Sequence, residues 1–384
     1  MSAIVLILIC SLIFTAIAKR LNIPAVIGQL AVGILLGPAC LKLVQPTHDL
    51  EFIAELGVIF LMFLAGLESD LALLKKYLKP AVTIAIAGVI FPLVTFSLLG
   101  NYLDYSFNHA FFLGIIFAAT SVSITIEVLN EYQALQSREG ATILGAAVVD
   151  DILAVLILSF FISSLNLPSR ANVSFSLPIK LILELLFVLL IYLLIRYLAP
   201  ALIKLANRLP VYASREMLAV ILCLALAFLA EFVGMSDVIG AFFAGVILSQ
   251  TKVAHEIEHN ISLIAYVFFI PIFFASIGLS MTFDGILSHL GLIILFTALA
   301  LLTKLIPCIL AAKIFGSKWD KAYLIGSGMV SRGEMALIVL QIGLANQLVK
   351  DDQYAMLIIV IILTTFIAPF MIKHAVNMGD NSTG

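Results

Sequence analysis

Residues 141–161 read ATILGAAVVDDILAVLILSFF, an apolar run whose only charges are the adjacent carboxylates Asp150 and Asp151. The run is long enough to cross a bilayer, which takes about 20 mainly apolar residues. At the centre of a membrane helix each carboxylate costs roughly 2.5–3.5 kcal/mol to insert. A pair retained at that cost indicates an intramembrane functional site. The alternative is a buried pair that only packs against a partner.

The rest of the chain has the same apolar character. Of its 384 residues 63% are hydrophobic and 11% are charged, and the mean hydropathy is +1.19. Soluble domains carry about 25% charged residues. The composition therefore predicts an all-α polytopic membrane protein without a soluble domain. Transport, channel activity and intramembrane chemistry remain as function classes, and nucleic-acid binding is excluded.

Apolar runs separated by Gly, Pro and charged residues predict about 13 transmembrane helices. The expected ranges are 3–18, 24–40, 52–69, 80–100, 109–130, 137–164, 179–206, 215–234, 237–251, 257–279, 286–313, 322–347 and 354–374. With the N-terminus outside, most Lys and Arg residues outside these ranges lie on the cytoplasmic side. This bias predicts a multi-pass protein of the cell membrane with its C-terminus in the cytoplasm.

The two halves of the chain resemble each other weakly at an offset of 212. Residues 26–28 (VIG) recur at 238–240, and residues 66–67 (GL) recur at 278–279. The assigned directions of the spans make the two copies inverted, as in many secondary transporters. We therefore expect two inverted six-helix repeats joined by a linker helix.

These repeats define one transmembrane transporter domain, residues 1–375. The expected parts are repeat one at about 1–164, the linker helix at about 179–206, repeat two at about 215–375 and a short cytoplasmic tail at 376–384.

Lys304 is the one charge in a second apolar run, residues 292–312, and it also lies deep in its span. A nearby carboxylate keeps a buried ammonium charged. We therefore expect one aspartate to pair with Lys304 while the other binds an ion. The alternative is a lysine that extends along the lipid to the headgroups.

Two spans have compositions that interrupt a helix. Residues 119–125 (ATSVSIT) combine hydroxyl and β-branched side chains, and residues 326–334 (GSGMVSRGE) contain three glycines. Thr120 and Arg332 are related by the same offset of 212. Matching interruptions indicate a transporter's substrate site, here in broken crossing helices 5 and 12. Their carbonyl and hydroxyl oxygens suit Na+ or Li+, although small residues for close helix packing are the alternative.

Arg332 and Glu334 are supporting buried charges of the second interruption. We interpret them as groups that neutralise the dipole ends of the broken helix. Direct substrate binding is the alternative.

Several of these features together resemble one family of transporters. The chain is similar to bacterial Na+/H+ antiporters of the monovalent cation:proton antiporter-2 family, NapA type, in Val149-Asp150-Asp151, Thr120-Ser121, Lys304, residues 27–30 (IGQL), residues 33–38 (GILLGP) and residues 66–68 (GLE). The similarity covers nearly the whole chain. It implies a homodimer in membrane lipid, a mobile core domain, elevator-like alternating access and electrogenic exchange of Na+ for H+. It implies no cofactor beyond the transported ions.

Our hypothesis assigns different roles to the two aspartates. Asp151 is the main Na+ ligand and proton carrier, and Asp150 pairs with Lys304 when no sodium is bound. Thr120 and Ser121 contribute oxygen ligands.

Three rival functions are left open. A K+/H+ antiporter differs only in cavity size and ligand number, which sequence does not show. An intramembrane aspartyl protease needs carboxylates facing each other from separate spans, whereas Asp150 and Asp151 are neighbours on one helix. A sodium-coupled carrier of an organic anion is disfavoured because the acidic pair repels anions.

Overall fold

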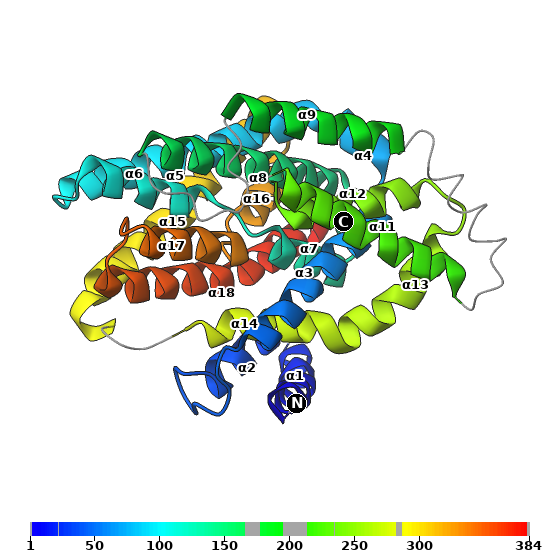
Figure 1. Ribbon diagram of the computed structural model, residues 1–384, viewed down its shortest axis with the longest axis horizontal. Helices are drawn as coiled ribbons and strands as arrows, with labels where there is room; N and C mark the ends of the chain where they lie inside the picture. Colours follow the sequence, from blue (N-terminus) through cyan, green and yellow to red (C-terminus); the bar gives the residue numbers. More distant parts are fainter. Residues whose placement is uncertain are drawn as a thin grey trace.

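The computed structural model describes residues 2–21, 23–165, 177–194, 213–233, 235–281 and 286–381. Within these ranges every regular element is a helix (Figure 1). The elements are α1 (Ser2–Arg20), α2 (Ala25–Leu36), α3 (His48–Glu68), α4 (Leu71–Lys76), α5 (Leu78–Tyr102), α6 (Phe107–Ala118), α7 (Val122–Glu131), α8 (Arg138–Ser164), α9 (Leu177–Leu193), α11 (Ser214–Phe232), α12 (Asp237–Ser249), α13 (Ala254–Ile264), η2 (Ala265–Phe269), α14 (Ile270–Leu279), α15 (Ile286–Ile314), α16 (Trp319–Gly328), α17 (Glu334–Ala345) and α18 (Asp351–Asn381). The predicted all-α fold is confirmed.

Where the structure describes the chain, each expected span coincides with one helix or with two or three consecutive helices. Eight stretches in the described part of the chain are long and apolar enough to cross a membrane. Two of the expected spans are each divided in two, as their composition predicted: α6 is separated from α7, and α16 from α17. The full number of spanning helices stays a prediction, and residues 195–206 of the expected linker helix lie outside the described residues.

Two boundaries differ from the sequence-based ranges for identifiable reasons. Helix α2 ends at Leu36, before the expected residue 40, because Pro38 cannot continue a helix. Helix α18 runs to Asn381 and so includes most of the segment expected as a tail. Hydropathy marks where an apolar stretch ends, whereas a helix can continue into water.

The helices pack as two groups. One group, called the α3 group, contains α1, α2, α3, α11, α12, α13, η2 and α14. The other, called the α5 group, contains α5, α6, α8, α15, α16, α17 and α18. Helix α7 lies between them, because it contacts α2 and α3 on one side and α8 and α18 on the other. Figure 1 shows α9 along one edge of the bundle and α1 and α2 at the opposite edge.

Two glycine pairs bring helices of the α3 group into backbone contact. A Cβ on Gly33 would lie 1.9 Å from the Ala275 carbonyl oxygen, and one on Gly66 would lie 2.1 Å from the Phe242 carbonyl oxygen. Gly33 also meets Gly278, as Gly66 meets Gly245. The offset of 212 relates Gly33 to Gly245 and Gly66 to Gly278, so the two contacts exchange under an internal two-fold axis. This supports two repeats, whose boundaries stay a prediction.

Candidate functional site

The two interrupted spans meet where each loses its helical structure. Helix α6 ends at Ala118 and α7 begins at Val122, while α16 ends at Gly328 and α17 begins at Glu334. The Ser121 N–H donates to the Ser331 carbonyl at 2.8 Å, and the Ser331 hydroxyl donates to the Ser121 carbonyl at 2.6 Å. The non-helical segments 119–121 and 329–333 therefore satisfy each other's backbone groups inside the bundle.

Side chains satisfy the carbonyl ends of the broken helices. Arg332 is fully buried, and its Nε and Nη2 donate to the Phe117 carbonyl near the end of α6, at 3.1 and 2.9 Å. Its Nη1 donates to the Val330 carbonyl at 2.8 Å. Thr125 donates to the Gly328 carbonyl at 2.7 Å, where α16 ends. A cation beside the carboxyl end of a helix is stabilising because that end carries partial negative charge.

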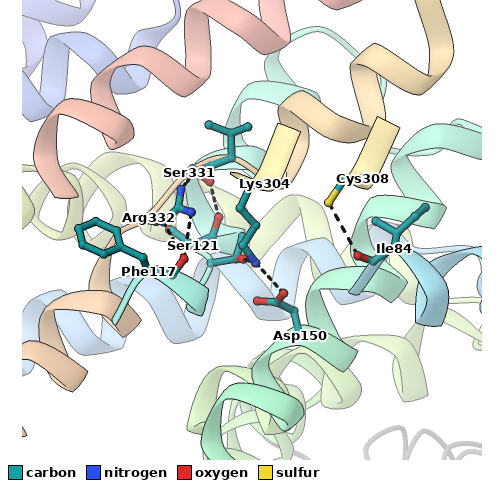
Figure 2. A network of polar contacts seen from close by, with 10 residues as sticks. Ile84, Phe117, Ser121, Asp150, Lys304, Cys308, Ser331 and Arg332 are labelled. Atoms are coloured by element: carbon teal, nitrogen blue, oxygen red, sulfur yellow. Dashed lines mark hydrogen bonds and ion pairs between the residues drawn. The ribbon is translucent and has the colours of Figure 1, made fainter. Parts of the chain in front are cut away.

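A buried ion pair lies next to this crossing (Figure 2). Lys304 of α15 donates to Asp150 Oδ1 of α8 at 2.7 Å, and both side chains have no exposed surface. The same ammonium donates to the Thr120 hydroxyl at 2.5 Å. Three elements distant in sequence therefore converge on one ammonium group.

The aspartate pair presents buried carboxylate oxygens beyond this ion pair. Asp150 Oδ2 has no hydrogen-bond partner among the described residues, and Asp151 is 3% exposed. Adjacent helical positions point about 100° apart, so the carboxylates face different sides of α8. A buried acceptor without a donor is uncommon in proteins, and a cation ligand is one use for it.

The structure brings together part of the predicted site. Asp150, Lys304 and Thr120 are in direct contact, whereas Ser121 forms backbone hydrogen bonds to the second interruption. Arg332 lies at the end of α6 rather than on the carboxylates, as expected of a group that compensates a helix end. Glu334 begins α17, and its side chain lies outside the described part of the chain.

Among the described residues no group of three or more His, Cys, Asp or Glu side chains is close enough together to hold a metal ion. A cation bound by the aspartate pair would therefore need hydroxyl or carbonyl oxygens to complete its shell. Hard oxygen ligands of this kind suit alkali cations. The interrupted helices supply both groups.

A family model for sodium/hydrogen exchangers, transmembrane, matches residues 4–378. The chain belongs to the sodium/hydrogen exchanger family. The resemblance to Na+/H+ antiporters is confirmed, and so is the expectation of a transporter and not an enzyme, which excludes the aspartyl protease. This exchanger is a multi-pass membrane protein.

Characterised relatives of the exchanger cover almost its whole length. It is 46% identical over 369 residues to a Na(+)/H(+) antiporter of Enterococcus hirae, with 96% of each chain covered. It is 38% identical to the Na(+)/H(+)-K(+) antiporter GerN of Bacillus cereus, covering 99% of this chain and 97% of that protein. The fold is similar to the sodium proton antiporter MjNhaP1 of Methanocaldococcus jannaschii, at a TM-score of 0.68, 18% identity and coverage of 98% and 95%.

The exchanger contains a second group of buried polar residues that was not predicted from the sequence. Glu127 of α7 is 7% exposed, and Asn130 and Tyr266 form hydrogen bonds beside it. The sequence signal was a carboxylate, Glu127, three residues before the expected end of the span 109–130. A charge at that position resembles one that reaches the membrane surface, so its burial depends on neighbouring helices that sequence does not show.

Proposed function

We propose that the chain is a secondary active antiporter that exports Na+, or Li+, in exchange for H+. The observation that carries the proposal is the Asp150–Lys304 ion pair, fully buried against Thr120 at the crossing of two interrupted helices. Insertion of these charges is costly, and an ion site at broken helices near the bilayer midplane is a recurring transporter design. The Na(+)/H(+) antiporter similarity supports the same reaction.

Asp151 is the main site at which Na+ and H+ compete, and Asp150 is the residue that changes partner. Without sodium, Asp150 accepts a hydrogen bond from Lys304, which is the arrangement seen in the structure. When Na+ binds, Asp150 turns its carboxylate to the ion and Lys304 releases its proton. Thr120 then loses a donor and becomes free to contribute its oxygen to Na+, with carbonyls of the segment containing Ser121 beside it.

The charges of the site support electrogenic exchange. With Asp151 protonated and Lys304 charged, the site that also contains Asp150 and Arg332 has one net positive charge. With Na+ bound, both aspartates ionised and Lys304 neutral, its net charge is zero. The two states differ by two protons and one Na+, so each cycle moves one charge across the membrane.

The packing supports alternating access by movement of one helix group against the other. A cavity of about 360 Å³ lies between them, lined by Glu55 and Val58 of α3, Asp237 of α12, and Ile338 and Gln341 of α17. The acidic side chains attract cations to the cavity. Under the predicted orientation this cavity lies on the outer side.

The homodimer, the cell-membrane location and the outside N-terminus belong to the same proposal. They rest on the family resemblance and on the distribution of Lys and Arg. In a background where the four native cysteines, of which Cys40 is exposed, are replaced by alanine, Lys42→Cys and Lys318→Cys place the two sides directly, because the expected topology puts these loops on opposite faces. An impermeant thiol reagent applied to whole cells labels only the position-42 variant if the orientation is right.

The deciding experiment measures Na+-driven pH changes in proteoliposomes. Asp151→Asn removes the charge that binds Na+ and H+, so exchange falls by at least about 100-fold, the loss expected from a principal charged ligand. Asp49→Asn is the matched control, because it makes the same substitution at an exposed position in the first turn of α3. Full exchange by Asp151→Asn would refute the assignment.

Lys304→Gln tests the second coupled proton. This variant keeps a hydrogen-bond donor near Asp150 but carries no charge, so any remaining exchange is electroneutral. The measurement is a potential-sensitive dye in the same vesicles during a Na+ pulse. A membrane potential of wild-type size from Lys304→Gln would show that Lys304 carries no coupled proton.

Competition of Na+ and H+ at Asp151 predicts a specific pH dependence. As pH falls, protons occupy the carboxylate and the KM for Na+ rises, while the rate at saturating Na+ falls much less. A KM that stays constant as the maximal rate falls would contradict a shared site.

K+ is the second candidate cation, because the relative from Bacillus cereus is named a Na(+)/H(+)-K(+) antiporter. Exchange measured with Na+, Li+ and K+ at equal concentrations separates the two functions. A larger maximal rate and lower KM with K+ than with Na+ would favour the K+/H+ alternative.

A further inference from the structure

A hydrogen-bonded acidic cluster joins α7 to the α3 group. The Asn130 amide donates to Glu68 Oε1 at 3.3 Å and to the Tyr266 hydroxyl oxygen at 3.0 Å. The Tyr266 hydroxyl in turn bonds to the Glu127 carboxylate. Hydrogen bonds therefore connect two carboxylates, an amide and a phenol that come from α3, α7 and η2. The sequence did not predict this cluster.

Glu127 is the buried end of this cluster. It is 7% exposed, and its Oε2 has no hydrogen-bond partner among the described residues. The other charged groups near it are Glu131, Glu68 and Lys19. A buried carboxylate oxygen without a donor is an open position for a cation, because leaving such an acceptor unpaired is costly.

The backbone places Tyr266 at this position through a π-helical turn. Residues Ala265–Phe269 form η2 between α13 and α14. Single π turns inside helices occur frequently at functional sites. Turning the Asn130 amide by half a rotation would present its oxygen in place of its nitrogen. The cluster can then offer oxygens from Glu127, Glu68, Asn130 and Tyr266.

The cluster lies between a polar hollow and the ion pair. Glu68 also lines a hollow of about 400 Å³, together with Ser69, Asp70 and Gln250. Under the predicted orientation this hollow faces the cytoplasm. Glu127 is six residues from Ser121 along α7, or roughly 9 Å at 1.5 Å per residue. Helix α7 therefore carries Glu127 and Asn130 of the cluster and begins two residues after Thr120.

We propose that Glu127, Glu68, Asn130 and Tyr266 form a transit site that binds a dehydrated alkali cation between the hollow and Asp151. The inference rests on the proposed cation exchange, and adds a second position at which Na+ pauses on its way from the cytoplasm. Carboxylate, amide and phenol oxygens are hard ligands of the kind that Na+ prefers. In the structure the hydrogen bonds of Asn130 and Tyr266 hold these groups together without the ion.

The kinetic test varies Na+ separately on each face of oriented proteoliposomes. Glu127→Gln keeps the size and the acceptor for Tyr266 but removes the charge, so the KM for Na+ on the cytoplasmic face rises about tenfold, the effect of losing one modest charged ligand. The KM on the other face and the maximal rate stay within about twofold. Glu131→Gln is the control, because it makes the same charge change one turn further on, at an exposed residue, and glutamine can still accept the hydrogen bond from the Ala25 N–H.

Two kinetic outcomes would overturn the transit site. Equal effects of Glu127→Gln and Glu131→Gln would mean that only the local negative potential matters. An altered maximal rate, or a raised KM on both faces, would mean that the cluster is a structural contact between α7 and the α3 group and not a cation site. Should Glu127→Gln not fold, Tyr266→Phe gives the same test, because it removes one ligand oxygen and keeps the packed ring.

A binding measurement separates this inference from the exchange mechanism. Na+ alone is titrated against purified protein in detergent, and thermal unfolding is recorded. Asp151→Asn retains a Na+-dependent rise in Tm through the transit site, and Asp151→Asn/Glu127→Gln loses it. If wild-type exchange is absent but this difference remains, the proposed function fails and the cation site stands. If both variants respond alike, the site fails even when exchange is normal.

Discussion

The two interrupted spans share a backbone design but differ in chemistry. The α6–α7 interruption supplies the Thr120 hydroxyl, which accepts from Lys304 beside Asp150. At the corresponding position, 212 residues later, the α16–α17 interruption supplies Arg332, whose guanidinium bonds to the Phe117 and Val330 carbonyls. One interruption therefore faces the ionisable pair, and the other holds a fixed cation.

This difference shows how an inverted repeat can divide two tasks. Both interruptions leave helix ends buried, and the carboxyl ends carry partial negative charge that needs donors. Arg332 and Thr125 satisfy these ends permanently, so Thr120 remains free to serve the ion pair. We therefore expect substitutions at the second interruption to change stability and those at the first to change ion affinity.

The largest effect is expected from Arg332→Ala. It removes three hydrogen bonds from a fully buried side chain, and buried carbonyls left without donors cost about 1–3 kcal/mol each. The free energy of unfolding should fall by at least about 3 kcal/mol, seen as a lower Tm in detergent. Arg332→Lys keeps the charge but cannot reach both carbonyls, so it gives an intermediate Tm. A wild-type Tm for Arg332→Ala would contradict the structural role assigned to the second interruption.

Thr120→Val should change ion affinity and lower stability less than Arg332→Ala does, because it leaves one N–H of the buried Lys304 ammonium without an acceptor instead of two carbonyls without donors. Valine has the shape of threonine but no hydroxyl, so Lys304 loses an acceptor and Na+ loses a ligand. The KM for Na+ should rise about tenfold, which corresponds to 1.4 kcal/mol. Thr120→Ser is the control that restores the hydroxyl. If Thr120→Val lowers Tm and leaves KM unchanged, the first interruption is a structural element like the second.

The ion pair and both interruptions were predictable from sequence for energetic reasons. Asp150 and its neighbour Asp151 are the only charges in one apolar run and Lys304 is the only charge in another, and a charge there is too costly to keep without a partner. The interruptions show in composition, because hydroxyl, β-branched and glycine residues weaken a helix at residues 119–125 and 326–334. These signals are local, so no knowledge of packing is needed to read them.

The acidic cluster was not predictable because its members meet only through tertiary packing. Asn130 and Tyr266 are separated by 136 residues, and their contact depends on a π turn that has no composition signal. Sequence gives the position of Glu127 along its span but not the helices that cover it. The bond from Arg332 to Phe117 is hidden for the same reason, because it joins two interruptions across 215 residues.

The smallest effect is expected from Thr125→Val, which tests the division of tasks within the first interrupted span. Thr125 belongs to α7, yet its hydroxyl donates to Gly328 of the second interruption and lies 3.1 Å from the Ser331 hydroxyl. Losing this cap should lower the free energy of unfolding by about 1 kcal/mol and leave the KM for Na+ unchanged.

Combining Thr125→Val with Ser331→Ala decides what these hydroxyls do. Residues that share hydrogen bonds couple by about 0.5–3 kcal/mol in a double-mutant cycle, so the two losses of stability should be non-additive. Ser97→Ala is the control, because its hydroxyl bonds within its own helix to the Leu93 carbonyl, at 2.6 Å. A raised KM in Thr125→Val with additive stabilities would move Thr125 into the ion site. In that case Thr125 of α7 would contribute to ion binding and not to stability. All of the first interrupted span would then serve the ion, and only the second would have the structural role.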